Sequence, residues 1–262
     1  MAEQDHGRTA LITGASSGIG CAIALQLAAR RYRLLLVARR TEKLAEVAER
    51  CRAAGGEAQF VSLDLADAAA VRDVMPAQLE AFGPVDVLIN NAGHNVLRPF
   101  ADLPEADADA LWQVHYFTPV ALMRALLPGM LARGRGVVIN VGSISTRVQP
   151  WGHGVYAAAK SALRSLTLTL HCEHRRSGVR FCVLTPGVVA TEFFDRDSYR
   201  GLRAMAMRHA LPVDRLAAAA LALIDRPRPE FVVPRHYRVI DAIQAVAPRI
   251  VQDWMANRGR PN

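Results

Sequence analysis

Lysine is almost absent from this chain: 32 of its 262 residues are basic, yet only Lys43 and Lys160 are lysines. The formal net charge of +8 raises the question of an anionic partner. The arginines are spread along the chain and form no long basic run, which is atypical of a nucleic-acid-binding surface. We therefore interpret the excess of arginine as a compositional bias and expect no nucleic acid among the partners.

Long apolar runs and closely spaced cysteines are also missing. No stretch approaches the roughly 18 apolar residues that a membrane helix needs, and the N-terminal MAEQDHGRTA lacks the basic and apolar segments of a signal peptide. The four cysteines include no Cys-x-x-Cys pair, so we expect buried free thiols and no metal site. These absences predict a cytoplasmic protein without membrane contact.

Short β-rich runs alternate with helical patterns along the whole chain. Strands are predicted over residues 8–14, 33–39, 57–65, 85–93, 136–143, 178–187 and 230–234. Helices are predicted over 18–31, 41–56, a stretch ending near 82, 104–133, 153–176, 213–225 and from about 236. This alternation predicts an α/β fold, a Rossmann-like doubly wound parallel sheet of about seven strands with helices on both faces. Without a linker or repeat, residues 1–262 are expected to form a single domain.

One stretch, from about 188 to 212, follows neither a helical nor a strand pattern and contains several aromatic residues, among them Phe193 and Tyr199. Long irregular segments inside compact domains are often functional. We interpret this stretch as a lid on the substrate side. The alternative is a surface excursion whose apolar residues cover the core.

A glycine-rich turn, TGASSGIG at 13–20, joins the first predicted strand to the first helix. Such a turn lets the backbone approach a pyrophosphate, and the helix N-terminus offers N–H donors. The spacing is G-x3-G-x-G, which differs from the G-x-G-x-x-G fingerprint. The cofactor contacts predicted here are Gly14, Ser16, Ser17, Gly18, Ile19 and Gly20. The alternative is an ordinary strand-to-helix turn.

The end of the second predicted strand bears on the choice of cofactor. A carboxylate at this place favours a free ribose 2′-hydroxyl, whereas arginine accommodates a 2′-phosphate. Here Arg39 and Arg40 follow Ala38, and no acidic residue is present at the tip. This predicts NADP(H) in preference to NAD(H), unless the two arginines are merely solvated.

A serine, a tyrosine and a lysine form a third motif. Ser143 ends a predicted strand, Tyr156 follows 13 residues later, and Lys160 is four residues further on. Residues four apart share a helix face, so the compact ammonium can lie beside the phenol and lower its pKa. The phenol can then exchange a proton with a carbonyl or carbinol oxygen, which the Ser143 hydroxyl can hold.

Together with NNAG at 90–93 and Pro-Gly at 186–187, these motifs resemble the short-chain dehydrogenase/reductase family over essentially the whole chain. The resemblance implies direct hydride transfer between a nicotinamide and a carbonyl or alcohol carbon, with Tyr156 as general acid/base. It implies that Lys160 also binds the nicotinamide ribose, and that the protein is a homodimer or homotetramer. The further cofactor contacts that it implies are Asp64, Leu65, Asn90, Asn91, Ala92, Gly93, Pro186, Gly187, Val189 and Thr191.

The sequence departs from the family pattern at two positions. NADP-using members often carry a second basic residue in the glycine loop, where this chain has Ser17. Members usually have an asparagine after the fourth strand that holds a water linking the lysine to solvent, and here the matching residue is His115. His115 could anchor that water or relay the proton itself. Alternatively its backbone carbonyl suffices, or the relay is impaired.

The expected function is NADP(H)-dependent reduction of a ketone, or the reverse oxidation of a secondary alcohol. The substrate pocket is predicted to contain Ser143, Tyr156, His94, Ser145, Trp151, Val188 and Phe193. Its apolar and aromatic character favours a moderately hydrophobic small molecule. Two alternatives remain open: a cofactor-binding sensor or scaffold without turnover, and a redox-neutral epimerase or dehydratase.

Overall fold

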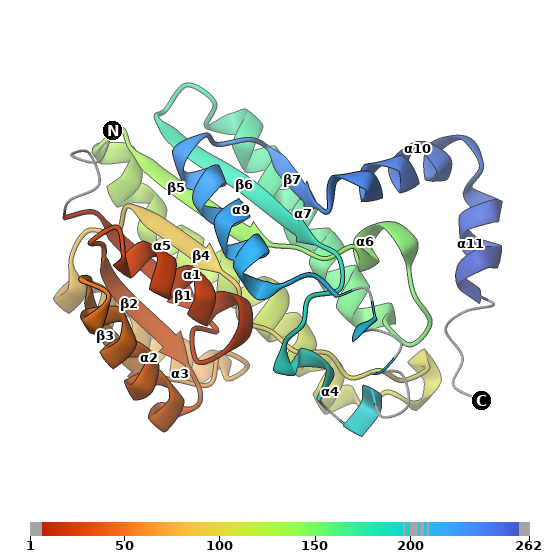
Figure 1. Cartoon of the computed structure of the whole chain (residues 1–262), viewed down its shortest axis with the longest axis horizontal. Coiled ribbons are helices and arrows are strands. Elements are labelled where there is room, and N and C mark those ends of the chain that lie inside the picture. The colour runs from red at the N-terminus through yellow and green to blue at the C-terminus, as the bar shows by residue number, and fades with distance from the viewer. Residues whose placement is uncertain (1–6, 196, 200–203, 205–206, 209, 257–262) are drawn as a thin grey trace.

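The computed structural model describes residues 7–195, 197–199, 204, 207–208 and 210–256, so parts of the predicted lid lie outside the described residues. Seven parallel strands form one sheet in the order β3-β2-β1-β4-β5-β6-β7 (Figure 1). The strands are β1 (Thr9–Thr13), β2 (Arg33–Ala38), β3 (Glu57–Ser62), β4 (Val87–Asn90), β5 (Gly136–Val141), β6 (Val179–Pro186) and β7 (Glu230–Val233). This is the predicted Rossmann-like, doubly wound sheet.

Helices connect the strands and continue beyond the last one. The α-helices are α1 (Gly18–Ala28), α2 (Thr41–Ala53), α3 (Ala68–Phe82), α4 (Glu105–Trp112), α5 (Thr118–Ala132), α6 (Ser145–Val148), α7 (Gly154–Glu173), α9 (Val213–Asp225), α10 (Arg238–Val246) and α11 (Pro248–Ala256). Short 3-10 turns are present at Phe100–Asp102, Glu192–Phe194, Asp197–Tyr199 and Arg235–Tyr237. Within the described residues, no helix is both long and apolar enough to span a membrane.

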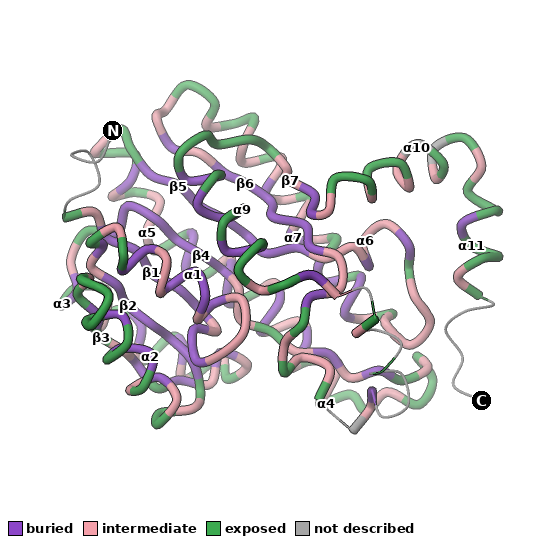
Figure 2. The backbone as a smooth tube through the Cα atoms, in the orientation of Figure 1, coloured by how far each residue is buried: buried purple, intermediate pink, exposed green. Residues whose placement is uncertain are grey.

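Two hydrophobic cores flank the sheet. On one face α1, α2 and α9 pack against alternate strand residues such as Ile12 and Leu36. On the other face α3, α5 and α7 cover the intervening residues such as Leu11 and Leu35. Successive side chains of a strand point to opposite faces, so a sheet covered on both sides requires nearly continuous apolar strands. Figure 2 shows this arrangement as buried strands enclosed by helices with exposed outer surfaces.

The structure differs from the predicted elements in three places. The helix predicted over 104–133 is divided by a π-helical turn at Gln113–Phe117. The C-terminal helix predicted from about 236 is broken before Pro248, whose ring cannot continue the hydrogen-bonding pattern of a helix. Helix α6 was not predicted. Of the cysteines expected to be buried, Cys172 is exposed.

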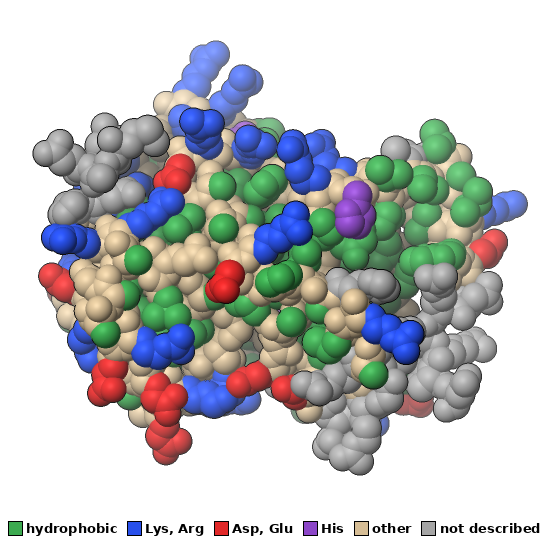
Figure 3. Space-filling view, viewed as in Figure 1, with side chains coloured by type: hydrophobic (Ala, Val, Ile, Leu, Met, Phe, Trp, Pro, Cys, Tyr) green, Lys and Arg blue, Asp and Glu red, His purple; other side chains and the backbone are tan. Residues whose placement is uncertain are grey.

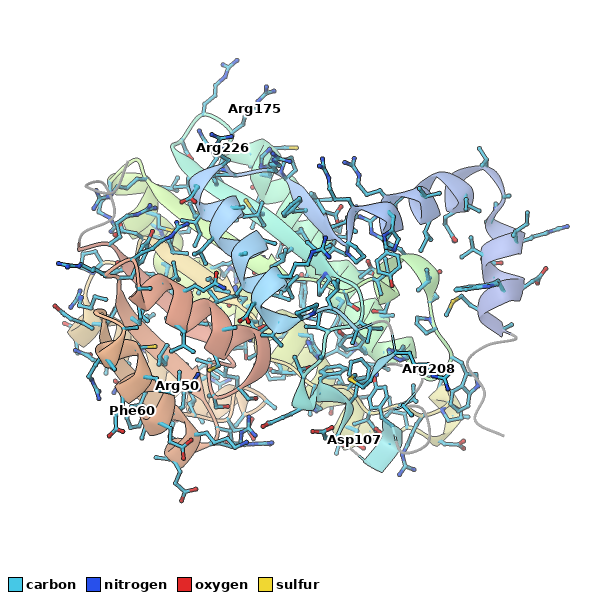
Figure 4. The ribbon with its side chains drawn as sticks, viewed as in Figure 1. Arg50, Phe60, Asp107, Arg175, Arg208 and Arg226 are labelled. Atoms are coloured by element: carbon cyan, nitrogen blue, oxygen red, sulfur yellow. The ribbon has the colours of Figure 1, made fainter. Side chains whose placement is uncertain are left out.

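Exposed arginines are dispersed over the surface. Figure 4 shows the labelled Arg175 and Arg226 pointing outward at the top of the view, with Arg50 and Arg208 on other parts of the molecule. The four labelled arginines therefore do not form one basic patch.

The functional cleft lies at the carboxyl ends of the strands. The strand order reverses between β1 and β4, and ligands of doubly wound sheets bind at this switch point. The turns that follow β1, β4, β5 and β6 all meet there.

Candidate active site

The glycine loop after β1 is fixed to the end of β4 by hydrogen bonds. The Asn91 side chain donates to the carbonyl oxygens of Thr13 (3.0 Å) and Gly14 (3.3 Å). The Thr13 hydroxyl accepts from the backbone N–H groups of Asn91 and Ala92, both at 3.0 Å. Gly14 has φ +67° and a Cβ there would lie 2.8 Å from Ala92 Cα, so both the conformation and the space require glycine.

The N-terminus of α1 opens onto the cleft. Ser17 occupies the N-cap position, and its side chain makes no capping bond within the described part of the chain. The first N–H groups of a helix have no partner inside the helix and attract anions. This end of α1 can therefore receive the phosphates of a dinucleotide.

Two of the predicted cofactor contacts lie behind the cleft wall. A Cβ on Gly20 would lie 2.4 Å from the carbonyl oxygen of Gly14, so this glycine allows α1 to pack closely against the loop. Asn90 is buried in the sheet and donates to Asn140 Oδ1 at 2.8 Å. Gly20 and Asn90 thus take part in packing and do not line the cleft, and their contact with the cofactor stays a prediction.

The two arginines after β2 differ in their surroundings. Arg40 donates to the hydroxyls of Ser16 (3.1 Å) and Ser17 (2.5 Å), and pairs with Glu192 at 2.6 Å. Hydrogen bonds from Lys43 and Arg40 lower the pKa of Glu192 to about 2. The Arg39 side chain is 65% exposed and lies 3.4 Å from Asp64. Arg39 is therefore the more accessible of the two guanidinium groups at this end of the cleft.

Ser143, Tyr156 and Lys160 meet where β5 ends beside α7. The Ser143 hydroxyl accepts hydrogen bonds from the backbone N–H (3.1 Å) and the hydroxyl (2.9 Å) of Ser145. Lys160 donates to the carbonyl oxygen of Val141 at 2.6 Å, and burial lowers its pKa to about 7. Burial raises the pKa of Tyr156 to about 12, although a hydrogen bond with Ser143 acts in the opposite direction.

The phenol therefore differs from the sequence expectation, which was a pKa lowered by Lys160. Tyr156 is 7% exposed and Lys160 is 4% exposed, so removal from water disfavours the charged form of each. As a result Tyr156 is protonated at neutral pH in the free chain. A protonated phenol is an acid, which suits proton donation to a carbonyl oxygen.

His115 lies within the π-helical turn and contacts Tyr156. The two rings are 4.9 Å apart in an edge-to-face arrangement. His115 Nε2 lies 2.5 Å from the carbonyl oxygen of His94, so this nitrogen carries the proton and donates. Burial, then Lys160, hold the pKa of His115 well below 6.5. Its Nδ1 is thus a buried acceptor, for which the described residues offer no hydrogen-bond partner.

The predicted lid segment packs on the substrate side of Tyr156. The ring of Phe193 lies 6.0 Å from that of Tyr156 and 5.9 Å from that of Tyr199. Tyr199 accepts from the buried Asn95 amide at 2.7 Å, and the same amide lies 3.2 Å from His153 Nδ1. Burial lowers the pKa of His153 to about 4, so this side of the cleft is uncharged at neutral pH.

One cleft of about 700 Å³ contains the predicted site residues other than Gly20 and Asn90. Sequence reasoning missed several residues of its wall. Four of these are Leu97, Tyr237, Trp254 and Met255. Three of them come from the chain after β7, where no motif signals proximity to the site, and only the amphipathic pattern of that stretch offered a clue.

Comparison with known proteins agrees with this geometry. The family profile described as short chain dehydrogenase matches residues 8–199. The chain belongs to the short-chain dehydrogenase family. It is 34% identical over 257 residues to a fatty acyl-CoA reductase of Mycobacterium tuberculosis, covering 96% of this chain and 85% of that protein. Relatives of this kind are reductases, and this protein is accordingly an oxidoreductase.

Two solved structures of this family superpose on most of the chain. A short-chain dehydrogenase from Sphingobium yanoikuyae, in complex with NADPH, has a TM-score of 0.80 and 28% identity, covering 97% of this chain and 96% of the other. L-Sorbose reductase from Gluconobacter frateurii, complexed with NADPH and L-sorbose, has a TM-score of 0.76 and 28% identity, covering 87% and 95%. Both neighbours agree with the sequence prediction of NADP(H) as the cofactor.

Proposed function

We propose that this short-chain dehydrogenase uses NADPH to reduce the carbonyl group of a moderately hydrophobic ketone. The observation that carries the proposal is a buried, protonated Tyr156 hydrogen-bonded to Ser143 in a cleft next to a dinucleotide-type loop. The protonated phenol, hydrogen-bonded to Ser143, can donate its proton to a carbonyl oxygen, which is the proton transfer that carbonyl reduction requires.

The residues of the cleft fit NADP(H). The N-terminus of α1 and the Gly14 turn suit the pyrophosphate, and the exposed Arg39 charge suits a 2′-phosphate. Lys160 extends from α7 toward the same cleft, where its ammonium can bind the nicotinamide ribose. The bound nicotinamide would supply the hydride.

The protein groups then manage the proton and the oxygen. We propose that the Ser143 and Tyr156 hydroxyls both donate to the substrate carbonyl oxygen, and that Tyr156 transfers its proton as the alcohol forms. Lys160, with a pKa of about 7, can take up and release protons near neutral pH and so restore the phenol. Ser145 orients the Ser143 hydroxyl through the two bonds described above.

For His115, the geometry favours one of the readings that the sequence left open. A neutral ring whose Nε2 is held by His94 can accept a hydrogen bond at Nδ1 but takes up a proton only at a large energetic cost. We propose that His115 accepts a hydrogen bond from a water or from Lys160 and orients that group. Direct proton transfer through the ring is disfavoured.

The substrate class follows from the wall beyond Tyr156. Phe193, Trp151 and Val188 make this part of the cleft apolar and aromatic, with His94 and Ser145 as polar groups near the reacting oxygen. The similarity to a fatty acyl-CoA reductase supports an apolar carbonyl compound. The lid role of 188–212, the homodimer or homotetramer, and the cytoplasmic location stay predictions.

Incubation with NADPH and a panel of ketones tests the proposal. We expect NADPH oxidation with stoichiometric alcohol, and slower turnover with NADH. NADPH binding without oxidation by any ketone would indicate a sensor or scaffold instead. Conversion of a substrate without net NADPH loss would indicate a redox-neutral epimerase or dehydratase.

A further inference from the structure

The chain after β7 forms an apolar arm. We call α10 and α11, residues 238–256, the C-terminal arm; in Figure 1 it extends from the body on the right of the view. Of the eight large hydrophobic side chains exposed among the described residues, five are on this arm. They are Val239, Ile243, Val246, Ile250 and Trp254. Because soluble proteins rarely gather exposed apolar residues in one place, this surface requires an explanation.

These side chains are arranged in order along the two helices. Val239, Ile243 and Val246 follow the spacing of one face of α10. Ile250 and Trp254 are one turn apart on the same face of α11, about 6 Å along its axis. Figure 3 shows hydrophobic side chains gathered over the region of α10 and α11. The apolar surface is therefore elongated.

One end of this surface belongs to the active-site cleft. Trp254 is 48% exposed on the arm and also lines the cleft that contains Tyr156, as does its neighbour Met255. Tyr237, just before the arm, lines the cleft as well, and its ring occupies the space that a Cβ on Gly187 would need. The arm thus continues the wall of the substrate site outward.

The arm is attached to the region around Ser143 by an ion-pair network centred on Arg147 and Glu230. Arg147 of α6 has a side chain only 9% exposed and pairs with Glu230 of β7 at 2.8 Å and with Asp241 of α10. Glu230 also pairs with Arg164 at 2.7 Å and accepts from Thr185. Because α6 begins two residues after Ser143, this network fixes α10 relative to the catalytic serine.

The charge of the cleft at this end restricts what could bind. The wall includes the uncharged residues Leu97, Pro150, Trp151, Phe194, Tyr199, Tyr237, Trp254 and Met255. Glu192, which adjoins Phe193 in the same cleft, is paired with Arg40 and Lys43. An uncharged, apolar group can leave the cleft along the arm without desolvating an ion. A second copy of the chain or a membrane surface would cover the arm without explaining why Trp254 lines the cleft.

We propose that the C-terminal arm binds the alkyl chain of a long-chain carbonyl substrate, from Trp254 at the cleft outward past Ile250. This inference rests on the proposed ketone reduction and names its substrate class. The carbonyl lies against Tyr156 and Ser143, and the chain lies on the arm. The ion pairs of Arg147 hold the C-terminal arm in a fixed position relative to Ser143 and Tyr156.

A series of methyl ketones from 2-butanone to 2-dodecanone, kept below the concentration at which they aggregate, tests the proposal. Each buried methylene should raise kcat/KM about threefold to fourfold until the chain passes the end of the apolar surface. In Ile250→Asp and Trp254→Ala, the ratio of kcat/KM for 2-dodecanone to that for 2-butanone should fall at least about tenfold. The matched control Leu131→Asp changes an exposed leucine of α5 and should keep the wild-type ratio.

An unchanged ratio in both arm variants overturns the proposal. The proposal is also overturned if the ratio of kcat/KM for the two ketones falls and the sedimentation coefficient of the variants changes, because a second copy of the chain would then cover the arm. A third result would favour a membrane surface and overturn the proposal. In it, the arm variants keep the wild-type dependence of kcat/KM on chain length but lose binding to phosphatidylcholine vesicles. If no ketone is reduced, the proposed function fails, and calorimetric binding of 2-dodecanone to the same variants then decides the role of the arm by itself.

Discussion

The two ends of the cleft are built in different ways. The cofactor end consists of backbone groups and ionised side chains, represented by the Gly14 turn, Arg40 and Glu192. The substrate end consists of aromatic rings, such as Phe193, Tyr237 and Trp254, which come from segments far apart in sequence. The first end is held by hydrogen bonds and ion pairs between the turns that meet there, and the second by packing between aromatic side chains.

This difference indicates how each end of the cleft selects its ligand. Charged and backbone groups at the cofactor end fit one kind of ligand, because each requires a defined partner. Apolar packing at the substrate end discriminates weakly, since one methylene more or less changes binding only modestly. If the proposals above hold, the family chemistry is encoded at the cofactor end, and the choice of substrate depends on the predicted lid and the C-terminal arm at the other end.

The largest effect on activity is expected at Tyr156, at the junction between the cofactor end and the substrate end of the cleft. Tyr156→Phe removes the proton donor and leaves the ring in place, so kcat/KM for ketone reduction should fall by about 10²–10⁴-fold. NADPH affinity, measured by fluorescence titration, should stay within a few-fold of wild type. As a control, Tyr32→Phe removes the hydroxyl of a tyrosine buried away from the cleft and should keep turnover. Near-normal rates in Tyr156→Phe would contradict the assignment.

At the cofactor end, Arg39→Asp should change cofactor preference. It replaces the accessible guanidinium by a carboxylate that repels a 2′-phosphate and can accept from a 2′-hydroxyl. The ratio of kcat/KM for NADPH to that for NADH should fall about 10–100-fold. Arg30→Ala, which removes an arginine paired with Asp225 outside the cleft, is the matched control. An unaltered ratio would refute the 2′-phosphate role of Arg39.

A smaller effect is expected from Lys160, one helical turn after Tyr156, which should make the free energy of unfolding depend on pH. Its pKa is about 7 in the folded chain against 10.5 for an exposed lysine, so between these values the unfolded state binds more protons. Folding stability from this group therefore rises with pH, by at most about 1.4 kcal/mol per pH unit. Urea unfolding of wild type and Lys160→Met at pH 7 and pH 9 should show wild type gaining about 2 kcal/mol over the variant. Parallel pH profiles would indicate an ordinary lysine pKa.

The smallest effect is expected at His115, beside the junction. If its Nδ1 accepts a hydrogen bond that orients the proton path, His115→Leu should lower kcat up to about tenfold and alter its pH profile. His115→Asn, which restores an acceptor, should recover most of the rate. Equal rates and pH profiles in all three proteins would mean that the side chain is dispensable and that the backbone carbonyl suffices.

The sequence predicted most of what local rules determine. The seven strands, the glycine loop and the Ser143–Tyr156–Lys160 set follow from apolar periodicity and fixed spacing, and the structure brings them together. For Gly20 the structure shows close packing against Gly14, a role that spacing alone does not distinguish from contact with the cofactor.

Tertiary contacts explain the features that were missed. The raised pKa of Tyr156 depends on its burial, which the Y-x3-K spacing does not report. The π-helical turn around His115 is a local change in helix geometry without a sequence signal of its own. Trp254 lines the cleft from an arm that Arg147 joins to α6 through Asp241, a contact between residues distant along the chain.

Transfer of deuterium from NADPH labelled at nicotinamide C4 tests the central claim most directly. In the wild-type protein, the alcohol formed from a ketone substrate should carry one deuterium on the carbinol carbon with one of the two C4 epimers, and Tyr156→Phe should form almost none. An alcohol without deuterium from either epimer, or no alcohol from any ketone, would contradict the account.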